Sequence, residues 1–119
     1  MGKILIVDDS PSEVANLRSI LTDAGWQSVT ASNGAEAVAK ASSEKPSLIL
    51  MDIIMPDMDG YEACRTLQQD PATKNIPVVF VSSKNQKADQ MWAKMQGAKA
   101  LIGKPYNAGE ILDTLKAYG

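Results

Sequence analysis

Short apolar runs alternate along this chain with segments in which apolar residues recur every three or four positions. The runs at 3–7, 48–51 and 78–81 contain almost no polar residue, which is typical of strands buried on both faces of a sheet. The segment at 26–31 alternates in polarity, so we expect a strand nearer an edge there. A very short run at 100–102 predicts a fifth strand.

Helical periodicity in the segments between these runs predicts five helices. We expect them after Ser10-Pro11 and up to Gly25, after Asn33-Gly34 and up to Pro46, at 61–69, at 89–96, and from Asn107 onward. Side chains that cap helices stand at their starts, Ser10 or Ser12 in the first and Asn107 in the last. Five alternations of strand and helix, joined by right-handed crossovers, predict an α/β fold with a parallel sheet and helices on both faces.

The composition is that of an ordinary globular domain, and it excludes several classes of function. The 119 residues suffice for one domain with a real core, and 45% of them are hydrophobic and 22% charged. A net charge of −2 without any basic run argues against direct binding of nucleic acid. One cysteine and no histidine exclude an internal disulfide and any histidine-based catalysis or metal ligation. Without a signal-peptide pattern or a membrane-spanning run, we expect a cytoplasmic protein with no membrane insertion.

Polar side chains follow four of the five predicted strands at their carboxyl ends. They are Asp8 and Asp9 after the first strand, Asp52 after the third, Ser82 after the fourth and Lys104 after the fifth. The carboxyl ends of parallel strands share one edge of the sheet, so we expect these side chains to converge. Three carboxylates in one place repel one another unless a cation joins them. A set of oxygen ligands without histidine or cysteine predicts Mg²⁺ first and Mn²⁺ second.

The remaining two groups suit a phosphoryl group. Lys104 offers a point positive charge and Ser82 a hydroxyl donor to an incoming anion with tetrahedral oxygens. With Asp52 as the carboxylate nucleophile, the set predicts a phosphoryl-transfer site in which Asp52 is the acceptor. Taken alone, each residue has a plainer interpretation as a helix cap, a turn residue or a surface lysine. The coincidence of all of them at strand ends favours the site.

These residues also carry a resemblance to a known family. Over essentially its whole length the chain resembles the CheY-like receiver domain of two-component response regulators. The matching motifs are Asp8-Asp9, Asp52-Ile53-Ile54-Met55-Pro56 with Asp59-Gly60, Ser82-Ser83, and Lys104-Pro105. The resemblance implies a flavodoxin-like, doubly wound sheet of five parallel strands in the order 2-1-3-4-5, with five helices. We expect a single receiver domain over residues 1–119, without an output domain.

The resemblance further implies how the metal ion is held. Asp9 and Asp52 would ligate Mg²⁺ directly, together with the backbone carbonyl of Ile54. Asp8 would act through a water molecule.

It also implies the reaction and the partners. Asp52 would take a phosphoryl group from a histidine kinase or phosphotransfer domain, Ser82 would move to bind that group, and Lys104 would pair with it. The fourth helix, fifth strand and fifth helix, at 87–119, would then change and bind a downstream protein. Self-phosphorylation and self-dephosphorylation would form a one-site cycle, so the protein would be a phosphoacceptor rather than an enzyme. A phosphate sink for a sister regulator is the alternative.

Two features refine this interpretation. Leu101 stands where the family commonly has Tyr or Phe, which puts an aromatic rotamer switch in doubt. Trp92 and Met91 could form a partner surface, or they could pack on the sheet.

Ser83-Lys84, Asp89 and residues 92–98 are similar to PilH-type single-domain regulators of pilus twitching and phototaxis, which suggests a motility role.

Two other functions use a similar sheet. A phosphatase of the haloacid-dehalogenase class also has an aspartate nucleophile at a strand end, but it needs a second aspartate two residues on, where this chain has Ile54. A flavin-binding module would need a phosphate loop rich in Ser, Thr and Gly after the first strand. This chain has Asp8-Asp9-Ser10-Pro11 there, and we discount both functions.

Overall fold

The computed structural model describes residues 2–119 as an alternation of strands and helices. The strands are β1 (Lys3–Val7), β2 (Gln27–Ala31), β3 (Leu48–Met51), β4 (Val78–Ser82) and β5 (Ala100–Gly103). The helices are α1 (Pro11–Asp23), α2 (Gly34–Glu44), α3 (Gly60–Gln69), α4 (Lys87–Met95) and α5 (Ala108–Tyr118). The predicted alternation is confirmed.

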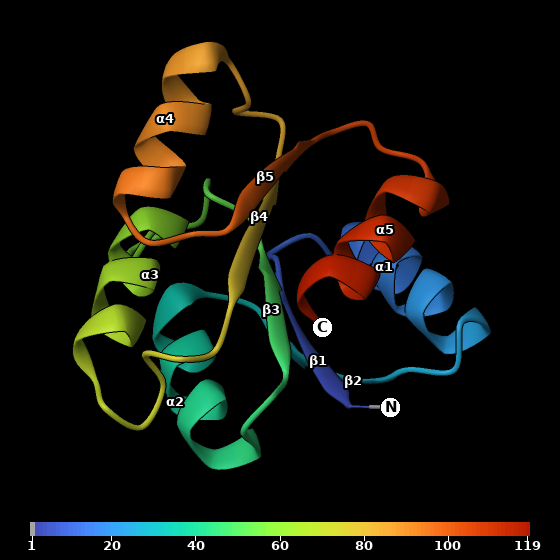
Figure 1. Cartoon of the computed structure of the whole chain (residues 1–119), viewed down its shortest axis with the longest axis horizontal. Helices are drawn as coiled ribbons and strands as arrows, with labels where there is room; N and C mark the ends of the chain where they lie inside the picture. The colour runs from blue at the N-terminus through green and yellow to red at the C-terminus, as the bar shows by residue number, and fades with distance from the viewer. Residues whose placement is uncertain (1) are drawn as a thin grey trace.

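The five strands form one parallel sheet in the order β2-β1-β3-β4-β5, as predicted. Helices α2, α3 and α4 cover one face of this sheet, and α1 and α5 cover the other (Figure 1). Successive strand residues point to opposite faces. In β1, Leu5 and Val7 therefore join the core on the side of α2 to α4, while Ile4 and Ile6 join the core beneath α1 and α5.

Local sequence determines where most of the helices begin and end. The side chains of Ser10, Asn33, Asp59 and Asn107 each accept a hydrogen bond from the backbone N–H three residues on. These bonds satisfy N–H groups that the first helical turn leaves without partners. Helix α4 begins two residues earlier than the predicted 89–96, because it starts with a capping box rather than a short polar cap.

The single cysteine of the chain lies in the interior. Cys64 of α3 is fully buried, and burial raises the pKa of its thiol to about 11. A thiol that stays protonated in this way is an ordinary core residue. Within residues 2–119, none of the helices has both the length and the apolar character needed to cross a bilayer.

The register of β1 and β3 brings their carboxyl ends together. Val7 lies opposite Met51, and the backbone N–H of Asp52 donates to the carbonyl of Val7. The residues that follow the two strands, Asp8 and Asp52, therefore lie side by side.

Candidate functional site

Three carboxylates meet at the carboxyl edge of the sheet. One carboxylate oxygen each from Asp8, Asp9 and Asp52 lies within 4.8 Å of the others. Asp8 and Asp52 are buried and Asp9 is exposed, so solvent reaches the cluster from the side of Asp9. A cleft of about 350 Å³ between α1 and the β2–α2 connection is lined in part by Asp8 and Asp9 and gives access to that side.

The ammonium group of Lys104 lies between two of these carboxylates, Asp8 and Asp52. Its Nζ donates to Asp8 Oδ2 at 2.9 Å and to Asp52 Oδ2 at 3.0 Å, and Glu13 Oε2 lies 3.9 Å away. Burial alone lowers the pKa of Lys104, but the hydrogen bonds to Asp8 and Asp52 outweigh that effect and raise its pKa to about 12. Lys104 is therefore fully charged at neutral pH.

The second oxygen of Asp52 is held by the backbone. Asp52 Oδ1 accepts from the N–H of Ile53 at 2.7 Å and from the N–H of Ile54 at 3.3 Å. One oxygen of this carboxylate is thus fixed by the loop and the other faces the Lys104 ammonium. The side chain of Ile54 is 56% exposed, and the role expected for its carbonyl stays a prediction.

The donor set at this edge fits a hard divalent cation. Burial raises the pKa of Asp8, with Asp52 contributing, and the hydrogen bond from Lys104 opposes the shift without cancelling it. Three carboxylates and one ammonium group leave this edge with a net negative charge, which a divalent cation would offset. Carboxylate oxygens without histidine or thiolate are the ligands that Mg²⁺ and Mn²⁺ take in proteins.

Ser82 is the last residue of β4 and pairs with Gly103, the residue of β5 that precedes Lys104. Its side chain is fully buried, and its carbonyl accepts from the N–H of Lys104 at 3.0 Å. Its Oγ accepts from the N–H of Lys84 at 3.2 Å. The hydroxyl is therefore hydrogen-bonded to the backbone of the β4–α4 connection.

An ion pair that the sequence did not predict holds this connection. Lys84 Nζ lies 2.7 Å from Asp89 Oδ1, and Asp89 Oδ2 accepts from the N–H of Gln86. The hydrogen bond from Lys84 holds the pKa of Asp89 below its ordinary value. The spacing of Gln86 and Asp89, three residues apart, is that of a capping box and signals their contact, but it does not signal the pairing of Asp89 with Lys84.

A second network that the sequence did not predict joins α1 to the β5–α5 connection. The hydroxyl of Tyr106 donates to Glu13 at 3.4 Å and accepts from Asn16 at 2.9 Å. Through Glu13 this network reaches the edge of the Lys104 site. These residues are about ninety positions apart, so only tertiary structure reveals the contact.

Gly60 lets the start of α3 pack directly against the loop that carries Asp52. Its N–H donates to the carbonyl oxygen of Ile53 at 2.8 Å. A Cβ at this position would run into the carbonyl oxygen of Asp52 and lie 2.8 Å from Ile53 Cα.

We expect Gly60→Ala to lower the free energy of unfolding by about 1–3 kcal/mol, the usual cost of overpacking. Urea denaturation measures this change. Gly109→Ala in α5, where the nearest atom belongs to the Asn107 side chain, is the matched control and should stay within about 1 kcal/mol of the parent.

Comparison with known proteins identifies a family and a relative that this chain resembles. The family model described as "Response regulator receiver domain" matches residues 4–116. The chain is 44% identical to the protein PilH of Pseudomonas aeruginosa over 117 residues, which cover 98% of this chain and 97% of PilH.

Solved structures agree with the sequence comparison. The chemotaxis protein CheY4 of Vibrio cholerae superposes with a TM-score of 0.93 at 32% identity, covering 100% of this chain and 99% of that one. A chain from the CheX-CheY-BeF3-Mg²⁺ complex of Borrelia burgdorferi superposes with a TM-score of 0.91 at 30% identity, covering 97% and 87%.

Proposed function

Because this chain belongs to the response regulator receiver family, we propose that it is a stand-alone phosphoacceptor whose Asp52 takes a phosphoryl group from a histidine kinase or phosphotransfer domain. The observation that carries the proposal is the meeting of Asp8, Asp9 and Asp52 at the sheet edge, with the ammonium group of Lys104 bonded to Asp8 and Asp52. The match to 97% of PilH supports a single-domain regulator. We further propose that it acts in the cytoplasm on pilus motility or phototaxis, as the resemblance of its sequence to PilH-type regulators implies.

Asp52 acts as the nucleophile. An oxygen of its carboxylate attacks the phosphorus of the donor, an O–P bond forms, and the N–P bond to the donor imidazole breaks. The two backbone N–H groups on Asp52 Oδ1 orient the carboxylate, and Lys104 offsets the charge of the incoming phosphoryl oxygens. Positioning and charge neutralisation account for most catalysis of phosphoryl transfer.

The acidic residues hold the divalent ion. Asp9, Asp52 and the carbonyl of Ile54 would ligate Mg²⁺ directly and Asp8 through water, with Mn²⁺ as a substitute. When bound, the ion neutralises charge that develops on the phosphoryl oxygens. The exposed position of Asp9 leaves this side of the cluster open to it.

Ser82 and Lys104 link the phosphorylation of Asp52 to the face formed by α4, β5 and α5. A phosphoryl group adds about −1.5 to −2 charge at neutral pH. The Ser82 hydroxyl would rotate to donate to a phosphoryl oxygen and give up the bond that it accepts from the N–H of Lys84, and Lys104 would pair with the same group. This exchange pulls on the β4–α4 connection and shifts the face formed by α4, β5 and α5 toward its partner-binding arrangement. Leu101 is buried in the core at this face, so its contribution is a small packing change.

Incubation with acetyl phosphate tests the proposal. With Mg²⁺ present, intact mass spectrometry should show the addition of one phosphoryl group. With EDTA in place of Mg²⁺, or with Asp9→Asn, the rate should fall at least about tenfold, because a charged ligand of the ion is missing. Asp23→Asn, an exposed acidic residue at the end of α1, is the matched control and should keep the parent rate. Equal rates with and without Mg²⁺ would contradict the proposal.

A further inference from the structure

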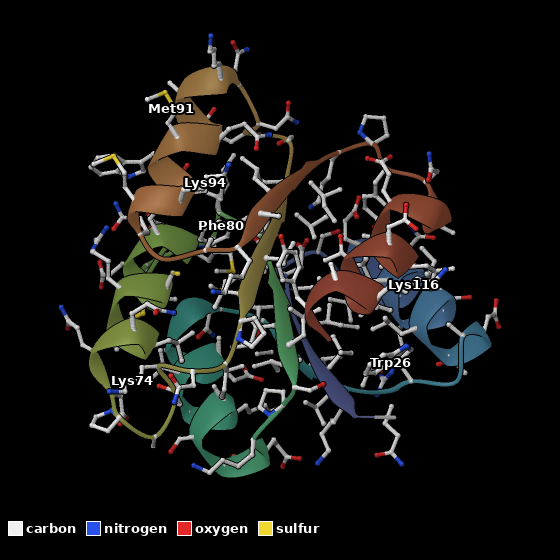
Figure 2. All side chains as sticks on the ribbon, in the orientation of Figure 1. Trp26, Lys74, Phe80, Met91, Lys94 and Lys116 are labelled. Atoms are coloured by element: carbon white, nitrogen blue, oxygen red, sulfur yellow. The ribbon has the colours of Figure 1, made fainter. Side chains whose placement is uncertain are left out.

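Helix α4 presents apolar side chains to solvent. Among residues 2–119, five large apolar side chains are exposed, and three of them lie on this one helix: Met91 at 62%, Trp92 at 45% and Met95 at 71%. Figure 2 shows Met91 on the outer side of α4, away from the sheet. Apolar groups gathered in this way mark interaction sites more often than scattered ones do.

The exposed apolar side chains extend from the outer side of α4 to the side that adjoins α3. Asp89 and Ala93, four positions apart, are buried and face the sheet. Met91 and Met95 come two positions after these residues, about half a turn around the helix, and so lie on the face away from the sheet. The ring of Trp92 meets the ring of Tyr61 in α3 edge-on, with centroids 6.4 Å apart. The apolar side chains therefore lie away from the side of α4 that meets β5, where the side chain of Gln90 donates to the carbonyl of Leu101.

The exposed charged side chains of α4 itself have one sign. Lys87 and Lys94 are the exposed charged side chains of α4, while its single acid, Asp89, is buried and paired with Lys84. Arg65 of α3, which donates to Gln96, adds a third cation near the end of the helix. From 71 to 109 the chain has six lysines and one acidic residue, although its net charge is −2.

We propose that Met91, Trp92 and Met95, with Lys87 and Lys94 beside them, form a docking surface for an acidic amphipathic helix of a partner protein. The methionines can adapt to apolar anchors on one face of that helix, and Trp92 offers a rigid contact held by Tyr61. The lysines select a partner whose flanks are acidic. The inference rests on the proposed function, because it names the chemistry of the partner that such a regulator binds.

The same features favour a protein over a membrane as the occupant. Electrostatic attachment to anionic lipid usually takes about four to eight basic residues in a cluster. Helix α4 has nine residues and two exposed lysines. It covers about 13 Å, the length of two to three turns of a docked helix.

Two synthetic peptides test the inference. One is an amphipathic helix of about 18 residues, or five turns, with leucine on one face and glutamate on the other. The second has lysine in place of each glutamate. Both carry fluorescein, and fluorescence anisotropy measures their binding to the full chain. We expect the glutamate peptide to bind at least about tenfold more tightly than the lysine peptide.

Variants of the chain locate the binding. The double variants Met91→Glu with Met95→Glu and Lys87→Glu with Lys94→Glu should each weaken binding of the glutamate peptide at least about tenfold. All four side chains are exposed, so folding should be unaffected. Tyr118→Ser and Lys74→Glu, which change exposed residues of the same kinds elsewhere, are the controls and should bind as the parent does.

The outcomes separate this inference from the proposed function. Equal binding of the two peptides, unchanged binding by both double variants, or binding to phosphatidylserine vesicles in place of the glutamate peptide would overturn the docking surface. Phosphoryl incorporation is measured in the same samples. Normal incorporation without peptide binding contradicts only the docking surface, and peptide binding without incorporation contradicts only the proposed function.

Discussion

The variant Asp52→Asn is expected to lose all phosphoryl incorporation from acetyl phosphate while keeping its fold. An amide nitrogen is not a nucleophile under these conditions, whereas a carboxylate oxygen is. The amide oxygen of an asparagine can still accept from the N–H groups of Ile53 and Ile54, which now bind Asp52 Oδ1, so the loop keeps its anchors. Intact mass after incubation with donor and Mg²⁺ measures the loss.

A neighbouring aspartate provides the control for this variant. Asp57→Asn removes one negative charge from the same loop, at an exposed position with a φ of 67° that asparagine tolerates. It should incorporate one phosphoryl group at close to the parent rate. Incorporation by Asp52→Asn at the rate of Asp57→Asn would place the acceptor elsewhere.

The second large effect concerns Lys104. Replacing it with methionine keeps the length and volume of the side chain but removes the charge that joins Asp8 to Asp52. The two buried carboxylates are then left to repel each other, and breaking a buried pair costs several kcal/mol. The side chain of Lys104 is 15% exposed, so we expect the free energy of unfolding to fall by about 2–3 kcal/mol without Mg²⁺.

Urea denaturation with and without Mg²⁺ measures this change. The divalent cation should stabilise Lys104→Met more than it stabilises the parent, because it replaces the missing positive charge. Lys3→Met is the control, since it breaks an ion pair with Glu44 whose side chains are 34% and 38% exposed. Exposed pairs contribute about 1 kcal/mol or less. Equal stability of Lys104→Met and Lys3→Met would show that Lys104 does not hold the carboxylates together.

Strand positions could be predicted from the sequence because burial on both faces leaves an unbroken apolar run. This holds for β1, β3 and β4, whose residues from Ile4, Leu48 and Val78 onward are buried. The order of the strands has no such local signal. It followed from the resemblance to a family, and the structure confirms it.

Periodicity located α4, but it did not identify which of its faces is buried, for a physical reason. Asp89 occupies the buried face of this helix, where an apolar residue would be expected. Its carboxylate is satisfied by Lys84 and by the N–H of Gln86, so burial is tolerated. The apolar side of the helix therefore faces solvent, and the interpretation that Met91 and Trp92 pack on the sheet is wrong.

The meeting of polar groups at the sheet edge could also be foreseen. Parallel strands bring their carboxyl ends to one side, so Asp8, Asp52 and Lys104 had to approach one another once the strands were placed. The contacts of Tyr106 with Glu13 and Asn16 could not be foreseen, because they depend on how the β5–α5 connection lies over α1.

Reductive trapping tests the central claim most directly. Borohydride converts an aspartyl phosphate into homoserine, and peptide mass spectrometry then locates the modified residue. After incubation with acetyl phosphate and Mg²⁺, we predict homoserine at position 52 and at no other aspartate. Homoserine at another position, or an unmodified residue 52 in a chain that has gained a phosphoryl group, would contradict the account.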